Sequence, residues 1–154
     1  MDNSEKELKY GQLVKEAASL LDGETDMIAN MANLAALIHE TMEFWWTGFY
    51  IVRTGNDGTE QLVLGPFQGP IACTRIAFGR GVCGTSWQHR ETIVVPDVEQ
   101  FPGHIACSSE SRSEIVVPIF HADSVTAVLD IDSRSLNTFN ETDSYYLEQI
   151  VRLL

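Results

Sequence analysis

Residues 113–133 read SEIVVPIFHADSVTAVLDIDS, and this stretch contains two short apolar runs joined by turn-forming residues. The runs 114–120 and 125–131 are rich in β-branched residues, and residues 121–124 between them are typical of a tight connection. In the first run, the odd-numbered side chains after Glu114 and the even-numbered ones are both apolar. A strand that is apolar on both faces is buried on both, so we predict a sheet covered on each side by helices or long loops.

Other segments with regular patterns precede and follow this hairpin. Short runs of β-branched and aromatic residues predict strands over 45–52, 61–67, 71–78 and 92–95. Apolar residues at helical spacing predict helices over 4–21, 27–42 and 82–89, with a last one starting at the N-cap Asn140. This order of helices, strands and a final helix predicts an α+β fold with a mainly antiparallel sheet.

Two details of the helical region are predicted from single positions. Ser4 and Glu7 have the spacing of a capping box, which predicts the start of the first helix. The apolar stripes of the first two helices include Leu20 and Ile28, and we therefore expect both side chains to be buried.

Length and charge limit the possible functions. The chain has 154 residues with no repeat or linker, so we expect a single domain over 1–154. Ten basic and 22 acidic residues give a net charge of −12, which disfavours nucleic acids and anionic membranes as partners. The polar N-terminal residues lack a signal-peptide pattern and no apolar run could span a bilayer, so we expect a cytoplasmic protein.

Three cysteines, Cys73, Cys83 and Cys107, have the spacing C-x9-C-x23-C. This spacing matches no zinc ribbon and no C-x-x-C redox motif, and we expect no metal site. Any one of them could be a small buried side chain. All three, however, lie in glycine-bordered, loop-like segments, where thiols are more often accessible and reactive, so a redox role stays open.

Three acidic residues interrupt the apolar hairpin. Asp130 and Asp132 are two residues apart and therefore lie on one face of their strand, while Glu114 opens the partner strand. If paired positions sum to an even number, Glu114 lies on that same face, and an odd sum places it opposite. The acids are then either strand ends that meet water or a carboxyl cluster that binds an ammonium group or holds a proton.

An aromatic segment, FWWTGFY at 44–50, forms the first predicted strand. Alternation places Trp46 and Tyr50 on one face and Trp45 and Phe49 on the other. Core packing and an aromatic wall beside a polar site both fit this pattern.

Read together, several segments resemble one enzyme family, the free methionine-(R)-sulfoxide reductases, which are built on a GAF domain. The matching motifs are WTGFY at 46–50, LGPFQGPIAC at 64–73, GRGVCGT at 79–85, PGHIAC at 102–107, SEIVVP at 113–118 and VLDIDS at 128–133. Their order and spacing agree with the family over roughly residues 15 to 150. The resemblance implies an antiparallel sheet of six strands flanked by helices.

The resemblance also implies roles for the site residues. Cys107 is expected to be the nucleophile, Cys73 the main resolving thiol and Cys83 a secondary one. The expected substrate-binding residues are Glu114, Asp130, Asp132, Trp46 and Tyr50. The reaction implied is reduction of free L-methionine-(R)-sulfoxide through a cysteine sulfenic acid and an intramolecular disulfide, which a thioredoxin-like protein reduces. No cofactor is expected. The oligomeric state stays open, with a homodimer as the alternative to a monomer.

A second function also fits a GAF domain. A GAF domain can also be a sensor without catalytic activity, which binds a small ligand and carries its cysteines as bystanders or redox triggers. Sensor GAF domains usually accompany an output domain, for which a chain of this length has no room.

Overall fold

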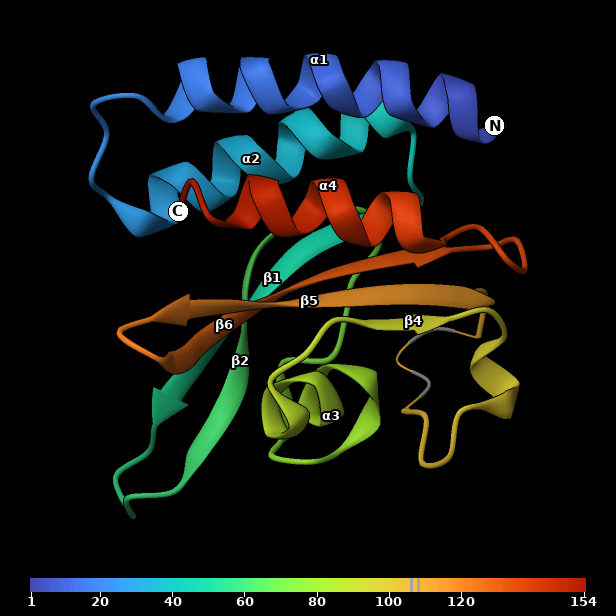
Figure 1. The fold of residues 1–154 in the computed structure, drawn as a ribbon. Helices are drawn as coiled ribbons and strands as arrows, with labels where there is room; N and C mark the ends of the chain where they lie inside the picture. Colours follow the sequence, from blue (N-terminus) through green and yellow to red (C-terminus); the bar gives the residue numbers. More distant parts are fainter. Residues whose placement is uncertain (106, 108) are drawn as a thin grey trace.

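The computed structural model describes residues 1–105, 107 and 109–154 and shows a curled antiparallel sheet between helices (Figure 1). Six strands are paired in the order β3-β2-β1-β6-β5-β4. The strands are β1 (Trp46–Thr54), β2 (Glu60–Gln68), β3 (Arg75–Ala77), β4 (Ile93–Val95), β5 (Ser113–His121) and β6 (Ser124–Ser133). The helices are α1 (Asn3–Leu21), α2 (Met27–Met42), α3 (Gly81–His89), the short 3-10 helix η1 (Val98–Gln100) and α4 (Glu141–Val151). The α+β architecture predicted from the sequence is thus confirmed.

The sheet is covered on both faces, as the apolar hairpin predicted. Helix α2 packs on β1 and β2, helix α4 packs on β5, and α1 lies over both helices (Figure 1). Helix α3 lies on the opposite face, against β5 and β6. Residues of β5 contribute to both cores, since Ile115 and Val117 face the helical layer while Val116 faces α3. Central strands of this kind are held by burial on both sides.

A buried ion pair joins the first and last helices. Lys6 Nζ lies 2.6 Å from Asp143 Oδ2, and the side chains are 7% and 0% exposed. The Tyr10 hydroxyl donates to the other carboxylate oxygen of Asp143 at 2.6 Å. Asp143 also accepts the backbone N–H of Asn140, which completes a capping box at the predicted start of α4. The buried carboxylate of Asp143 is thus bonded to Lys6, Tyr10 and Asn140, and its contacts with Lys6 and Tyr10 fix α1 against α4.

Several local predictions were wrong. The cap of α1 is Asp2, which accepts the N–H of Glu5 at 2.9 Å, and Ser4 lies inside the helix. A carboxylate is a good cap because it also complements the positive end of the helix dipole. Leu20 and Ile28 are exposed at the edges of their helices rather than buried.

The predicted strand 71–78 is reduced to β3, over Arg75–Ala77. The residues just before it are held away from the strand ladder by two aromatic side chains of β1. The Trp46 indole donates to the carbonyl of Pro70 at 2.9 Å, and the Tyr50 hydroxyl donates to that of Cys73 at 2.8 Å. This departure from the strand carries Cys73 toward the centre of the sheet.

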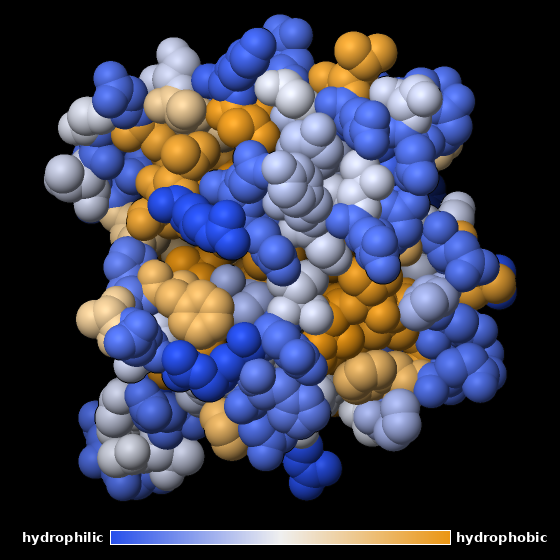
Figure 2. Space-filling view, in the orientation of Figure 1, coloured by the Kyte–Doolittle hydropathy of each residue, from blue (hydrophilic) through white to orange (hydrophobic). Residues whose placement is uncertain are grey.

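The surface around this framework is mixed in polarity. Figure 2 shows a mainly hydrophilic face in which apolar side chains gather in separate patches. Within the described residues, no helix combines the length and the apolarity that crossing a membrane requires.

Candidate active site

Strand register brings the three acids of the hairpin together. Glu114 on β5 pairs with Asp132 on β6, and Val116 pairs with Asp130, so paired positions sum to an even number. The acids therefore lie on one face, on the side of α3. A bulge between Ile119 and Phe120 changes the register only near the hairpin turn, beyond the acids.

Strand β1 adds aromatic side chains to the same face. Trp46 pairs with Asp132, and two residues further along the strand Gly48 pairs with Asp130. A Cβ at Gly48 would lie 2.6 Å from the Trp46 ring, so glycine is needed for the indole to lie across the strand. Tyr50 and Phe67 stack beside that indole, with centroids 6.1 and 5.3 Å away.

The predicted faces of the aromatic segment are largely confirmed. Trp46 and Tyr50 share the acid face, and Phe49 lies in the helical core. The prediction for Trp45 was wrong, because this residue precedes the strand in a bend and packs beside Trp46 on the acid face. Alternation does not extend past the strand end.

Burial controls the protonation of the carboxyl groups. Glu114 and Asp130 are each 6% exposed, and Ser111 Oγ donates to Asp132 Oδ1 at 2.7 Å. Burial, together with the negative charges of its two neighbours, raises the pKa of Glu114 well above its usual range. Burial and the charge of Asp130 raise the pKa of Asp132 in the same direction.

Asp130 differs from the other two acids. Burial raises its pKa, but hydrogen bonds from Glu114, Cys83 and Asp132 stabilise the ionised form and oppose that rise. Its Oδ1 atom is buried and has no hydrogen-bond partner among the described residues. Of the three acids, Asp130 therefore ionises most readily, while the pKa shifts of Glu114 and Asp132 favour their protonated forms.

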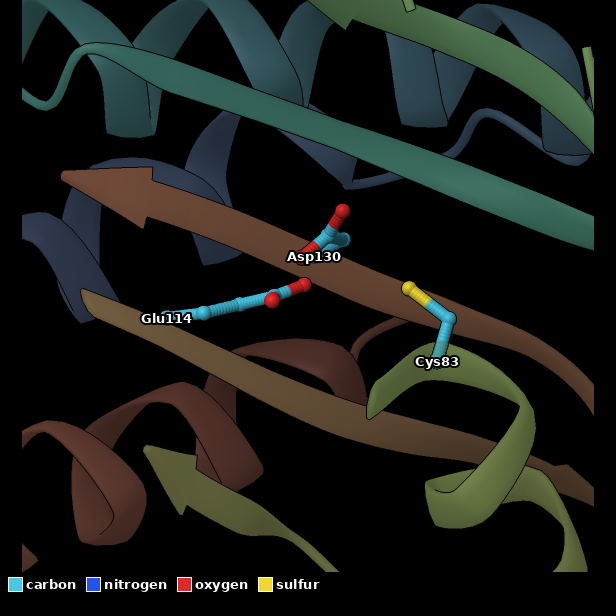
Figure 3. A group of neighbouring side chains, drawn as sticks. All are labelled: Cys83, Glu114 and Asp130. Carbon is cyan, nitrogen blue, oxygen red and sulfur yellow. The ribbon is translucent and has the colours of Figure 1, made fainter. Parts of the chain in front are cut away.

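The thiol of Cys83 points into this acid cluster from the first turn of α3 (Figure 3). Its Sγ and carboxylate oxygens of Glu114 and Asp130 all lie within 4.8 Å of one another. Such a group could surround one metal ion, but burial and then the nearby carboxylates raise the pKa of the Cys83 thiol. Because metal ligands must be deprotonated, the arrangement favours holding protons over binding a metal.

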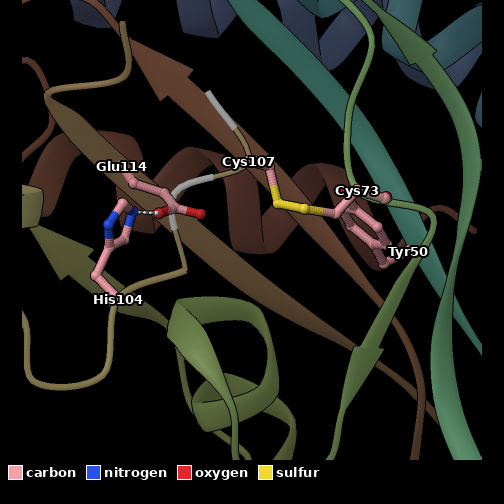
Figure 4. Close-up of a disulfide and its surroundings, with 5 residues drawn as sticks. All are labelled: Tyr50, Cys73, His104, Cys107 and Glu114. Atoms are coloured by element: carbon pink, nitrogen blue, oxygen red, sulfur yellow. Dashed lines mark hydrogen bonds and ion pairs between the residues drawn. A yellow bond between two sulfur atoms is a disulfide. The ribbon is translucent and has the colours of Figure 1, made fainter. Parts of the chain in front are cut away.

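The other two cysteines form a disulfide at the edge of the same cluster (Figure 4). Cys73 and Cys107 are 34 residues apart in the chain, and their Cα atoms are 5.4 Å apart. Cys107 is exposed and Cys73 is half-buried. The bridge therefore joins the segment before β3 to the loop before β5.

A small cavity connects the bridge with the acids. The residues that line it are Trp45, Trp46, Ile71, Ala72, His104, Ile105, Cys107, Ser111, Glu114 and Asp132. With the bridge closed its volume is about 50 Å³, far below that of most ligand pockets. The disulfide form is thus a closed state of the site.

Two polar side chains of the cavity were not assigned to the acid cluster from the sequence. His104 Nε2 lies 3.8 Å from Glu114 Oε1, and burial lowers the pKa of the imidazole (Figure 4). A lowered pKa favours the neutral imidazole, which adds no positive charge that would stabilise ionised Glu114. Sequence patterns could not place His104 or Ser111 beside the acids, because both lie in a loop without periodicity.

Comparison with known proteins places this geometry in a family. Residues 24–154 match the family model described as GAF domain. The free methionine-R-sulfoxide reductase of Escherichia coli is 42% identical over 146 residues, which cover 94% of this chain and 86% of that protein. This chain belongs to the free methionine-R-sulfoxide reductase family.

Further members of the family agree over nearly the whole chain. The free methionine-R-sulfoxide reductase of Saccharomyces cerevisiae is 41% identical, with 99% of this chain and 87% of the relative covered. The X-ray structure of the reductase from Neisseria meningitidis in complex with its substrate has a TM-score of 0.92 and 48% identity. It covers 99% of this chain and 89% of that one. The fold and the family predicted from the sequence motifs are both confirmed.

The raised pKa of Glu114 predicts a stability effect that depends on pH. Above its usual pKa near 4.5 the unfolded carboxyl group loses a proton that the native state keeps, so this group lowers native stability as pH rises. Glu114→Gln removes this contribution. The melting temperature of Glu114→Gln minus that of the wild type should therefore increase between about pH 5 and pH 7.5.

Glu7→Gln is the matched control, because Glu7 is exposed. The melting temperature of Glu7→Gln minus that of the wild type should stay nearly constant over the same pH range. The measurement uses the substrate-free disulfide form and a calorimetric scan at each pH. An equally flat difference for Glu114→Gln would show that Glu114 is ionised in the native state.

Proposed function

We propose that this chain reduces free L-methionine-(R)-sulfoxide to methionine, with Cys107 as the nucleophile and Cys73 as the resolving thiol. One observation carries the proposal: the Cys73–Cys107 bridge borders a cavity lined by the carboxyl groups of Glu114 and Asp132, whose pKa values burial raises well above their usual range. Family membership supports the same reaction, since relatives with this name match nearly the whole chain.

The carboxyl groups supply the acid that the reaction needs. A sulfoxide sulfur is a poor electrophile until its oxygen is protonated or accepts strong hydrogen bonds. Glu114 or Asp132 gives a proton to that oxygen while Cys107 sulfur attacks. The sulfoxide is reduced by two electrons to methionine, and Cys107 is oxidised to a sulfenic acid that keeps the oxygen. The proton released by the Cys107 thiol restores the carboxyl group.

The second step forms the bridge seen in the structure. The Cys73 thiol attacks the Cys107 sulfenic acid, an S–S bond forms, and the oxygen leaves as water. A dithiol protein of the thioredoxin kind then reduces the bridge, in keeping with a reaction in the reducing cytoplasm. The cavity must widen when the bridge opens, because about 50 Å³ is too small for the substrate.

Substrate recognition uses both halves of the site. The negative charge that Asp130 leaves on the cluster attracts the ammonium group, which favours a free amino acid over a residue in a peptide. Trp46 and Tyr50 form the wall against the methylthio end. A fixed acid and a fixed thiol approach opposite sides of the sulfur in one epimer only.

Replacing Cys107 and replacing Cys73 should affect methionine formation differently. Cys107→Ser should abolish reduction, because a hydroxyl is a far weaker nucleophile than a thiolate toward sulfur. Cys73→Ser should instead form about one equivalent of methionine per enzyme and then stall, since the sulfenic acid has no partner. Rapid-quench assays with limited reductant measure both results. Sustained turnover of Cys107→Ser would overturn its assignment as nucleophile.

A panel of four substrates tests the proposed function itself: free R, free S and N-acetylated R methionine sulfoxide, and a sulfoxide-containing peptide. Dithiothreitol is the reductant, and methionine formation is the readout. Free R should be reduced, and loss of the ammonium contact should slow the N-acetylated form by about 30-fold or more. Equal rates on the peptide would refute the role of the acids. Absence of activity on free R would favour a sensor.

A further inference from the structure

The tripeptide Ile-Ala-Cys occurs twice in the chain, at 71–73 and 105–107, and each copy ends at one cysteine of the bridge. Each bonded cysteine is therefore preceded, two residues earlier, by an isoleucine. Ile71 is 91% exposed and Ile105 is 39% exposed. Ile71 is the most exposed of the large apolar side chains in the described part of the chain.

The fold keeps both side chains at the surface. Hydrogen bonds from Trp46 and Tyr50 hold the carbonyls of residues 70 and 73, on either side of Ile71, so this segment is fixed and its isoleucine stays outside the core. Ile105 lies over the start of α3, where a Cβ at Gly81 would come within 3.2 Å of it. Exposed apolar side chains that the structure holds in place are typical of interaction surfaces.

The chemistry of the bridge indicates which partner needs this surface. A closed disulfide must be reached by an external thiolate, and an apolar rim offers nothing to a small anionic thiol such as glutathione. The net charge of −12 repels that thiol further. A protein dithiol whose reactive thiol sits in an apolar surface fits both the bridge and the rim. Redox partners of this kind use small, transient interfaces.

We propose that the disulfide rim, defined as Ile71, Ala72 and Ile105 around the Cys73–Cys107 bridge, is the docking surface for a protein dithiol of the thioredoxin class. This inference rests on the proposed function, because only a turnover disulfide needs a partner. One partner thiolate attacks a bridge sulfur, forming a mixed disulfide and releasing the other cysteine. The second partner thiol attacks the mixed disulfide, so the bridge becomes two thiols and the partner becomes a disulfide.

The test compares two reductants on the same enzyme. Wild type, Ile71→Ser, Ile105→Ser and the double variant are assayed with saturating free R sulfoxide, using either a thioredoxin recycled by its reductase or dithiothreitol. The measured quantity is kcat/KM for thioredoxin divided by the rate constant with dithiothreitol, so that any effect on substrate binding or chemistry cancels. Leu8→Ser is the matched control, because Leu8 is 78% exposed on α1, across the sheet from the rim.

The double variant should lower this ratio about tenfold, the size expected when central apolar contacts of an interface are lost. The Leu8→Ser ratio should stay at the wild-type value. A double-variant ratio within about twofold of wild type would overturn the docking surface, as would a wild type that turns over with dithiothreitol but not with thioredoxin. Absence of methionine formation with both reductants would instead refute the proposed function.

Discussion

Three carboxyl groups on one face of β5 and β6 must share a small buried space, and the properties of the site follow from this constraint. If all three were ionised, their repulsion would add to the cost of removing each charge from water. Burial therefore raises the pKa of Glu114 and Asp132 well above their usual range, while hydrogen bonds to Asp130 oppose the rise of its pKa. Apolar side chains at these positions would make the sheet more stable. The buried carboxyl groups therefore lower the stability of the fold and serve the function of the site.

Packing and ion pairing elsewhere in the fold offset this loss of stability. Strands β5 and β6 are buried on both faces, which fixes the register that places the acids opposite one another. The ion pair between Lys6 and Asp143 fixes the helical layer behind them. Cys83 and His104 approach the cluster from α3 and from the loop before β5. Burial raises the pKa of the Cys83 thiol and lowers that of the His104 imidazole, which favours the uncharged form of each. The buried, protonated state of Cys83 is a poor one for a resolving thiol, and it suits a group that donates to Asp130.

How much of this could be predicted from sequence depends on whether a residue lies in a regular element. Period-two alternation along β5 and β6 was enough to place Glu114 with Asp130 and Asp132 once the parity of the pairing was known. It failed for Trp45, which lies in a bend before β1, and for 71–73, where Trp46 and Tyr50 donate hydrogen bonds to the carbonyls of residues 70 and 73. The pairing of Cys73 with Cys107 followed from family resemblance alone, because their spacing reflects two loops. No pattern predicted the contact of His104 with Glu114 for the same reason.

The proposed mechanism requires a carboxyl group, Glu114 or Asp132, that holds a proton at neutral pH and gives it to the sulfoxide oxygen. Infrared difference spectroscopy observes this proton directly, through the C=O stretch of a protonated carboxylic acid. We expect such bands in the reduced, substrate-free protein at pH 7. Their intensity should fall in Glu114→Gln, which leaves the contribution of Asp132, and their frequency should change when substrate binds to the Cys107→Ser variant. Identical carboxyl bands in wild type and Glu114→Gln at pH 7 would contradict this expectation.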